Sequence, residues 1–224
     1  MKAILESLSI VIVAKDLNVS IFKPFWLMKN NIFHEQELQG NIVITPPAVQ
    51  IPTQNFQFMV LPDRLQMLMP RQYPDAEADI ARVVGGIVKT LPHTPYTAVG
   101  LNFNYFIAPE SEDAFGAWNR NLFASPVASR LQLPEDKNAR FGSYVSFDVL
   151  GMRLKIDIKP IKVAANIESL CKSWHTGQDL ILLNFNFHSD VVSSESPADS
   201  IIDKLDKWSE SLVFSQKLIA MFSE

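Results

Sequence analysis

Hydrophobic and polar residues alternate along several short stretches of the chain, and this alternation predicts β-strands with one buried and one exposed face. The clearest case is residues 152–159, in which Met, Leu and Ile alternate with Arg, Lys and Asp. Successive side chains of a strand point to opposite faces, so this strand has one face against a core and one in water. Alternation or β-branched content also predicts strands over residues 7–14, 41–45, 56–60, 65–69 and 145–149.

Turn-forming residues arrange these strands in the sheet. Residues 61–64, Leu-Pro-Asp-Arg, separate the strands of one hairpin, and Leu150-Gly151 separates the strands of another. Pro46 and Pro47 follow the strand at 41–45. Because proline cannot donate to a strand ladder, we expect that strand to lie at a sheet edge.

Apolar residues at three- and four-residue spacing predict the helices. The predicted helices begin near Pro24, Pro74, residue 111, residue 167 and Ser196, and the last of them is a single long helix. Gly85 and Gly86 fall inside the second of these helices. A glycine in a helix costs about 1 kcal/mol relative to alanine, so we expect a kink or close packing at this point.

Two of the strands carry a pair of asparagines. Residues 99–106 read Val-Gly-Leu-Asn-Phe-Asn-Tyr-Phe, and residues 181–188 read Ile-Leu-Leu-Asn-Phe-Asn-Phe-His. In each strand the apolar side chains share one face and both asparagines share the other. Asparagine is a poor strand residue, so this recurrence requires a reason. The candidate binding residues are Asn102, Asn104, Asn184, Asn186 and His188.

The amides of these asparagines can present both donors and acceptors to a peptide or a polar ligand. The alternative is that they only hydrogen-bond to neighbouring backbone or to water, as most side-chain amides do. His93 precedes the first asparagine strand in a proline-rich loop, and we include it as a further binding candidate because loops often carry function. Two prolines that stiffen the connection explain this loop without any chemistry.

The order hairpin, helix, strand, helix occurs twice in the chain, which predicts an internal duplication. Phe58 matches Phe147, and Trp118 matches Trp208, in corresponding positions of the two units. Chance recurrence of hydrophobic patterns is the alternative. We expect an α+β fold with a mostly antiparallel sheet, in which two similar halves form one compact pseudo-twofold body. The predicted halves are residues 1–124 and 125–224.

Composition and charge narrow the classes of function. The chain of 224 residues has a net charge of −4 and a pI near 5.6, which argues against a general nucleic-acid binder. It has no run of 18 apolar residues, so no membrane-spanning helix is predicted. A single cysteine, Cys171, excludes an internal disulfide, and we predict a cytoplasmic protein without a signal sequence.

No catalytic, phosphate-binding or metal-binding motif stands out. Cys171 and His175 are spaced to share a helix face, but a structural zinc site requires four ligands, and no second pair has a suitable spacing. We therefore expect Cys171 to be a buried core residue. The sequence predicts no catalytic residue, no metal and no cofactor.

The preferred hypothesis is a non-enzymatic interaction or scaffold protein that self-associates, as in a homodimer, or binds another protein through an apolar face. Hydrophobic residues make up 47% of the chain, which is consistent with a buried interface in addition to the core. The alternative is a small-ligand-binding protein, or an enzyme without a recognised motif, whose site is a groove between the halves near the asparagine strands and His93.

Overall fold

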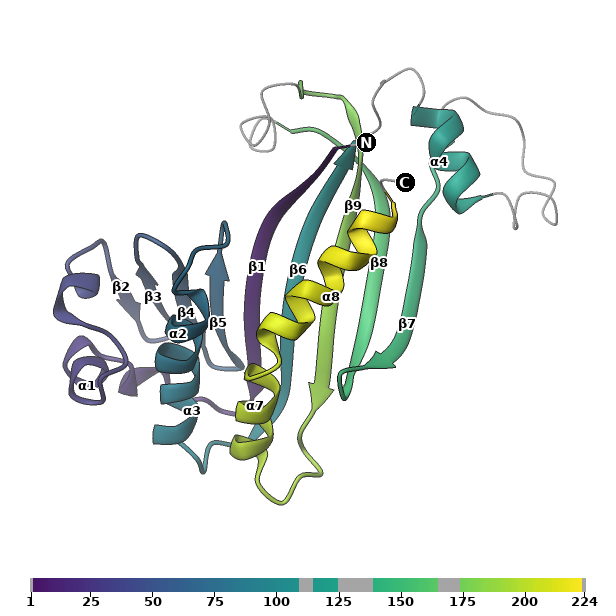
Figure 1. Cartoon of the computed structure of the whole chain (residues 1–224). Coiled ribbons are helices and arrows are strands. Elements are labelled where there is room, and N and C mark those ends of the chain that lie inside the picture. The colour runs from purple at the N-terminus through teal and green to yellow at the C-terminus, as the bar shows by residue number, and fades with distance from the viewer. Residues whose placement is uncertain (1, 109–114, 125–138, 165–173, 223–224) are drawn as a thin grey trace.

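The computed structural model describes residues 2–108, 115–124, 139–164 and 174–222, which form one antiparallel sheet with helices packed on it (Figure 1). The nine strands of this sheet lie in the order β2-β3-β4-β5-β1-β6-β9-β8-β7. Their bounds are β1 (Lys2–Ala14), β2 (Val43–Thr45), β3 (Ala48–Pro52), β4 (Gln57–Leu61), β5 (Arg64–Met69), β6 (Tyr96–Ala108), β7 (Ser143–Val149), β8 (Met152–Lys162) and β9 (Asp179–Asp190). The predicted α+β class with a mostly antiparallel sheet is confirmed.

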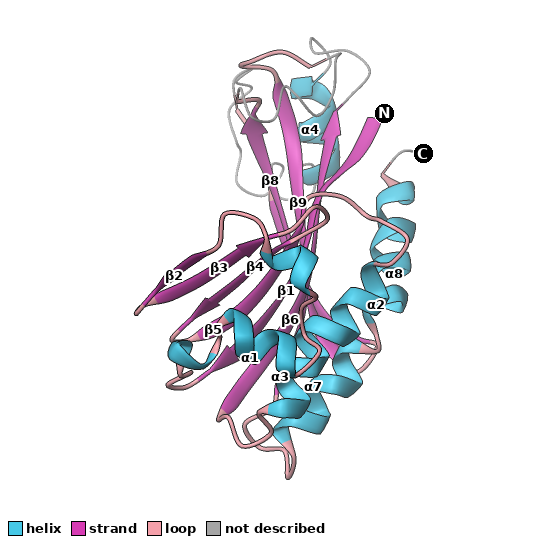
Figure 2. Cartoon of the chain, turned by 90° about the vertical axis from the view of Figure 1, so that its left-hand side faces the viewer, coloured by secondary structure: helices cyan, strands magenta, loops and turns pink. Residues whose placement is uncertain are grey.

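Helices lie along one face of this sheet, as the turned view shows for α2, α3, α7 and α8 (Figure 2). The helices are α1 (Pro24–Lys29), α2 (Ala76–Asp79), α3 (Gly86–Thr90), α4 (Phe115–Phe123), α7 (Pro197–Leu205) and α8 (Trp208–Met221). Short 3-10 turns occur at Val19–Ile21 and Glu35–Leu38, and a π-helical segment, Ile80–Gly85, joins α2 to α3. None of the helices in the described residues is long and apolar enough to cross a membrane.

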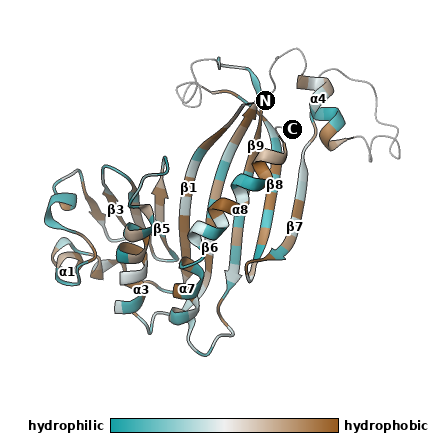
Figure 3. Cartoon of the chain, in the orientation of Figure 1, coloured by the Kyte–Doolittle hydropathy of each residue, from teal (hydrophilic) through white to brown (hydrophobic). Residues whose placement is uncertain are grey.

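The alternation along the strands explains which face the helices cover. In β8, Met152 and Leu154 are buried, whereas Arg153 is exposed. The hydropathy colouring shows hydrophobic and hydrophilic positions following one another along the strands (Figure 3). The buried side chains of neighbouring strands align on the helix side, where Phe103 of β6 has its ring centroid 4.8 Å from that of Trp208 in α8. Burying a large apolar side chain stabilises the fold by roughly 1.5–3 kcal/mol. Hydrophobic burial on this side therefore attaches the helices to the sheet.

The opposite side of the sheet, which we call the open face, carries most of the polar strand positions. One end of it is covered by a small apolar cluster that includes Phe106, Leu180 and Trp174. The rings of Phe106 and Trp174 meet edge to face, with centroids 6.0 Å apart. Along β6, Asn104 and Asn102 follow directly after this cluster on the same face and are only partly buried. The asparagines thus lie at the border between the part of the open face that this cluster covers and the part that no other described element covers.

The predicted hairpins are confirmed by the strand pairing. Leu61 pairs with Arg64 across a two-residue turn in the first hairpin, and Val149 pairs with Met152 in the second. Leu150 and Gly151 both have positive φ, 54° and 68°, as a type I′ turn requires. This turn fixes the register of β7 on β8.

The two glycines predicted to mark a kink or close packing lie at the junction between the π-helical segment and α3. A Cβ added to Gly85 would lie 3.6 Å from Cδ1 of Ile202, so α7 packs closely against this turn. Wider π turns commonly occur where a helix must adapt to its neighbours or to a function. Here the π-helical segment and the missing side chain at Gly85 let α7 pack close to the backbone of this segment.

The C-terminal segment differs from the single long helix predicted for it. It forms two helices, α7 and α8, and the α-helical hydrogen bonding is interrupted at Asp206 and Lys207. The amide of Lys207 bonds the carbonyl of Lys204, three residues back, which is a tighter turn than the α-helix has. The break lets Leu205 and Trp208, at the two helix ends, both be buried.

The structure does not confirm the pseudo-twofold arrangement of two similar halves. In the sheet, β5 and β6 are separated by β1 and run parallel to each other, because each is antiparallel to β1. By contrast, β8 and β9 are adjacent and antiparallel. The corresponding units therefore differ in topology, and the N-terminal strand is the element that separates them. Most of the helix predicted around residues 167–174, most of the predicted junction between the halves, and Cys171 lie outside the described residues.

Candidate functional site

The four predicted asparagines meet on the open face as two cross-strand pairs. Asn102 of β6 lies opposite Asn186 of β9, and Asn104 lies opposite Asn184. Directly opposite residues of an antiparallel pair have Cβ atoms roughly 4.5–5.5 Å apart, close enough for their side chains to interact. We call these four residues the amide ladder. Since β6 and β9 are hydrogen-bonded neighbours, the ladder lies on one continuous sheet surface.

One pair of the amide ladder forms a directed chain of hydrogen bonds. Nδ2 of Asn186 donates to Oδ1 of Asn102 at 2.5 Å, and Nδ2 of Asn102 donates to Oγ of Ser9 in β1 at 3.3 Å. Aligned amides polarise one another, which strengthens such a chain. Gly100 leaves room for it, because a Cβ at this position would lie 3.2 Å from Nδ2 of Asn186. This pair therefore ties three strands together.

The other pair of the ladder is less constrained. Nδ2 of Asn104 donates to Oγ of Ser7 at 3.1 Å. In the described part of the chain, no hydrogen bond involves the side chain of Asn184, which lies between Asn104 and Asp157 across the strands. A partly exposed amide without a protein partner keeps its donors and its acceptor for water or a ligand. Asn184 is thus the asparagine that fits a binding role best.

His188 lies on the open face beside a hollow of about 340 Å³. Its Nε2 is 3.1 Å from Oδ1 of Asp190, and Arg153, directly opposite in β8, pairs with Asp148 at 3.1 Å. These four side chains and the turn at Gly151 line the hollow. Exposed ion pairs contribute only about 0–1 kcal/mol, so a ligand can compete for these groups. The hollow offers charges of both signs.

His93 does not lie near the amide ladder. It is exposed in the loop between α3 and β6, and β6 begins at Tyr96. Asn102 lies six residues further along the strand, which corresponds to about 20 Å at the rise of a β-strand. In the loop, the carbonyl of Pro95 accepts a hydrogen bond from the amide of Lys15. The stiff loop therefore connects α3 to the sheet at a distance from the amide ladder.

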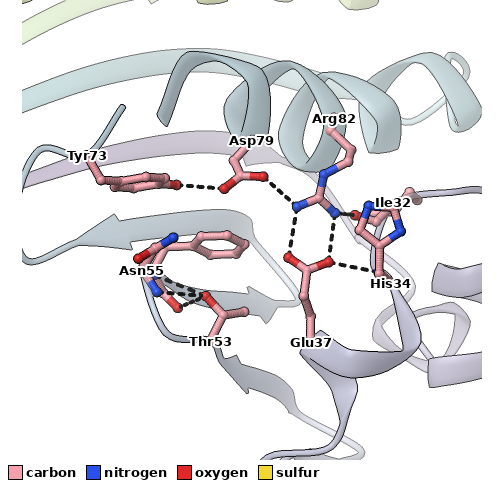
Figure 4. A network of polar contacts seen from close by, with 9 residues as sticks. Ile32, His34, Glu37, Thr53, Asn55, Tyr73, Asp79 and Arg82 are labelled. Atoms are coloured by element: carbon pink, nitrogen blue, oxygen red, sulfur yellow. Dashed lines mark hydrogen bonds and ion pairs between the residues drawn. The ribbon is translucent and has the colours of Figure 1, made fainter. Parts of the chain in front are cut away.

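A second polar cluster surrounds Arg82 in the π-helical segment (Figure 4). Its guanidinium binds Glu37 through two hydrogen bonds, Nη1 to Oε2 at 2.9 Å and Nη2 to Oε1 at 2.8 Å. Nη2 also donates to Oδ1 of Asp79 at 2.5 Å, and Nη1 donates to the carbonyl of Ile32 at 2.6 Å. The hydroxyl of Tyr73 donates to Oδ2 of Asp79 at 3.0 Å. One arginine thus connects three segments of the chain.

This cluster has a structural role that the sequence analysis missed. The side chains of Arg82, Glu37 and Asp79 are only 22%, 21% and 16% exposed. Burial and the neighbouring carboxylate of Asp79 raise the pKa of the Tyr73 hydroxyl above its usual range. The three-residue spacing of Asp79 and Arg82 was a visible signal for their pairing. The contact with Glu37, 45 residues away, had no local signal.

The outer strand β7 is the third candidate. It is the last strand of the sheet, and in the described residues no strand pairs with its outer side. On the helix side, Val145 is 40% exposed, and the ring centroid of Phe147 lies 6.4 Å from that of Phe214 in α8. On the open face, Tyr144 is 62% exposed. We call β7 together with Phe214 the outer margin.

Neither a metal site nor a comparison with known proteins helps to choose between these candidate sites. Within the residues that the structure describes, no three His, Cys, Asp or Glu side chains are grouped to hold a metal ion. His175 lies in the segment before β9, whereas its possible partner Cys171 is outside the described residues. No protein-family model, no curated protein and no solved structure matches the chain. The function must therefore be inferred from the geometry of the described residues.

Proposed function

We propose that this chain is a non-enzymatic interaction protein that binds an extended polypeptide segment along the outer edge of β7. The supporting observation is a seven-residue edge strand that has exposed apolar side chains beside it. The outer side of such a strand presents backbone N–H and C=O groups, which a further strand can pair with. Main-chain hydrogen bonds then provide affinity, and side-chain contacts provide specificity.

The side chains of the outer margin define what the bound segment looks like. Val145 and Phe147 lie on the helix side, where the ring of Phe147 meets that of Phe214, and both favour apolar residues at alternate positions of the partner. Tyr144, Ser146 and Asp148 lie on the open face and favour polar residues between them. The preferred segment therefore alternates apolar and polar residues over about seven positions.

Binding of short peptides to the whole chain tests this proposal. Fluorophore-labelled seven-residue peptides with alternating apolar and polar residues should bind with micromolar to millimolar affinity, measured by fluorescence anisotropy. Val145→Lys should weaken binding by about tenfold or more, because a charge replaces an apolar contact. Val43→Lys, at a similarly exposed position of the other edge strand, is the matched control and should bind normally. Failure of every peptide to bind the chain in its monomeric form would refute the proposal.

A second candidate function is the binding of a small polar ligand beside the amide ladder. Two separate features of the open face favour it: the hollow at Arg153 and His188, and the amide of Asn184, which has no hydrogen bond within the described residues. A panel of small polar compounds should then raise the melting temperature. Asn184→Ser should abolish this shift without lowering the melting temperature of the free chain, whereas a loss of stability alone would assign Asn184 a structural role.

A further inference from the structure

The sequence of β7 is complementary to itself, which identifies the polypeptide that its outer edge fits best. We infer that the partner is a second copy of this chain, whose β7 pairs antiparallel with the first about a twofold axis at Ser146. This inference rests on the proposed role of the outer margin and names its occupant. It would extend one nine-stranded sheet into the next.

The register centred on Ser146 pairs all seven residues of the strand. Val145 then faces the partner's Phe147 on the helix side, and the same contact is repeated on the other side of the axis. Ser146 faces the partner's Ser146 on the open face. Shifting the pairing by one residue would place apolar side chains opposite polar ones, because every side chain would change face. Moving the axis by one residue in either direction would keep the faces matched but leave only five residues paired.

Charge is also compatible with this register. Asp148 lies opposite the partner's Tyr144, so no two carboxylates face each other across the axis. Like charges directly opposite are destabilising in a sheet, whereas a tyrosine hydroxyl can donate to a carboxylate. Asp148 keeps its pairing with Arg153 on the other side. A twofold interface uses the same patch on both copies. The five inner residues of β7 satisfy this condition with polar-to-polar and apolar-to-apolar contacts, and Ser143 faces the partner's Val149 at each end.

The same pairing would complete the hollow on the open face. Asp148 forms part of the wall of the hollow, and β7 is the outermost strand on that side. The partner's Tyr144, opposite Asp148, would add an aromatic wall that one copy lacks. Each hollow would then contain residues of both copies.

The oligomeric state of the whole chain is the first test. In sedimentation velocity over a concentration series, the wild-type chain should shift from monomer to dimer. Val145→Lys should raise the dissociation constant by about tenfold or more, while Val43→Lys should leave it unchanged. Circular dichroism and thermal unfolding verify that both variants fold. A wild-type chain that stays monomeric at every concentration, or equal effects of the two variants, would overturn the inference.

Cysteine cross-linking tests the register independently of those variants. In a Cys171→Ser background, Ser146→Cys would place two thiols on directly opposite residues, whose Cα atoms lie about 4.5–5.5 Å apart, within the range for a disulfide. Mild oxidation should therefore yield a covalent dimer. Asp148→Cys is the matched control, because its two copies would be separated by four residues along the strands, about 13 Å, and should not cross-link. Cross-linking of Asp148→Cys instead of Ser146→Cys would refute this register.

The two proposals can fail separately. If alternating peptides bind to β7 but the chain remains monomeric and Ser146→Cys does not cross-link, the edge is an interaction site for a different polypeptide, and only the inference of a second copy is wrong. If neither peptides nor a second copy bind, both proposals fail.

Discussion

The two ends of the sheet both expose apolar side chains, but they differ in how much strand edge is open. At one end, β2 has three residues, and the chain turns back at Pro46 and Pro47. Val43 in this strand is 47% exposed. At the other end, β7 has seven residues without a proline, and Val145 is 40% exposed. Similar exposure therefore accompanies very different capacities to pair with another strand.

The comparison shows that the length of free backbone, rather than hydrophobic exposure, distinguishes the two edges. A three-residue strand offers few N–H and C=O groups to a partner, and short edge strands are one way in which proteins avoid unwanted pairing. A seven-residue strand is as long as most strands within sheets. The outer margin is thus the end at which pairing is favoured.

The polar clusters at the two ends of the sheet differ in how deeply their side chains are buried. Behind the β2 end, Arg82 connects the segment around Glu37 to the π-helical segment, and all of its partners are largely buried. At the β7 end, Asp179 at the start of β9 binds Arg140 and Lys162, and the Lys162 side chain is 69% exposed. We expect the first cluster to contribute more to stability than the second.

The largest expected effect is the loss of the Arg82 cluster. Arg82→Met should lower the free energy of unfolding by about 2–4 kcal/mol, because it leaves two carboxylates partly buried without their cation. Urea unfolding measures this change. The matched control is Arg71→Met, at an exposed arginine, which should change stability by no more than about 0.5 kcal/mol. Similar small effects of both variants would show that the cluster is not a stabilising clamp.

A smaller, pH-dependent effect is expected for Asp179. Burial alone would raise the pKa of this carboxyl, but hydrogen bonds and charges from Arg140 and Lys162 outweigh it and lower the pKa below its usual range. A lowered pKa in the folded state stabilises the fold above the unfolded pKa, and this contribution is lost as the pH falls through the folded pKa. Asp179→Asn should therefore destabilise the chain by about 1–2 kcal/mol at neutral pH and by less in acid.

Urea unfolding at a series of pH values measures this dependence. Asp203→Asn, at an exposed position of α7, is the control and should show no comparable change with pH. A difference between wild type and Asp179→Asn that stays constant from neutral pH into acid would contradict the assigned role of the carboxylate.

The smallest expected effect concerns the turn that sets the register of β7. Gly151 has φ of +68°, which an L-residue adopts at a cost of about 1 kcal/mol, so Gly151→Ala should destabilise the chain by about that amount. Gly86→Ala, in a helix with its nearest neighbour at 3.7 Å, should have the opposite sign because alanine favours helix. Thermal unfolding of both variants measures the contrast, and the same sign for both would contradict this account.

Much of the fold could be predicted from local patterns in the sequence. Strand alternation placed both hairpins, the turn at Leu150-Gly151 and the shared face of the asparagines in each strand. The helical pattern did not reveal the break at Asp206, because the apolar spacing of α7 continues into α8. The break accompanies the burial of both Leu205 and Trp208, which is a matter of tertiary packing. The predicted duplication also relied on local similarity, which contains no information about strand order.

The sequence by itself determined the alternation of buried and exposed residues, since side-chain direction in a strand follows from backbone geometry. The tertiary structure decided which strands became neighbours. It inserted β1 between β5 and β6, paired Asn102 with Asn186, brought Glu37 to Arg82 and left β7 at the edge. These outcomes depend on contacts between residues far apart in the chain, which a local pattern does not encode.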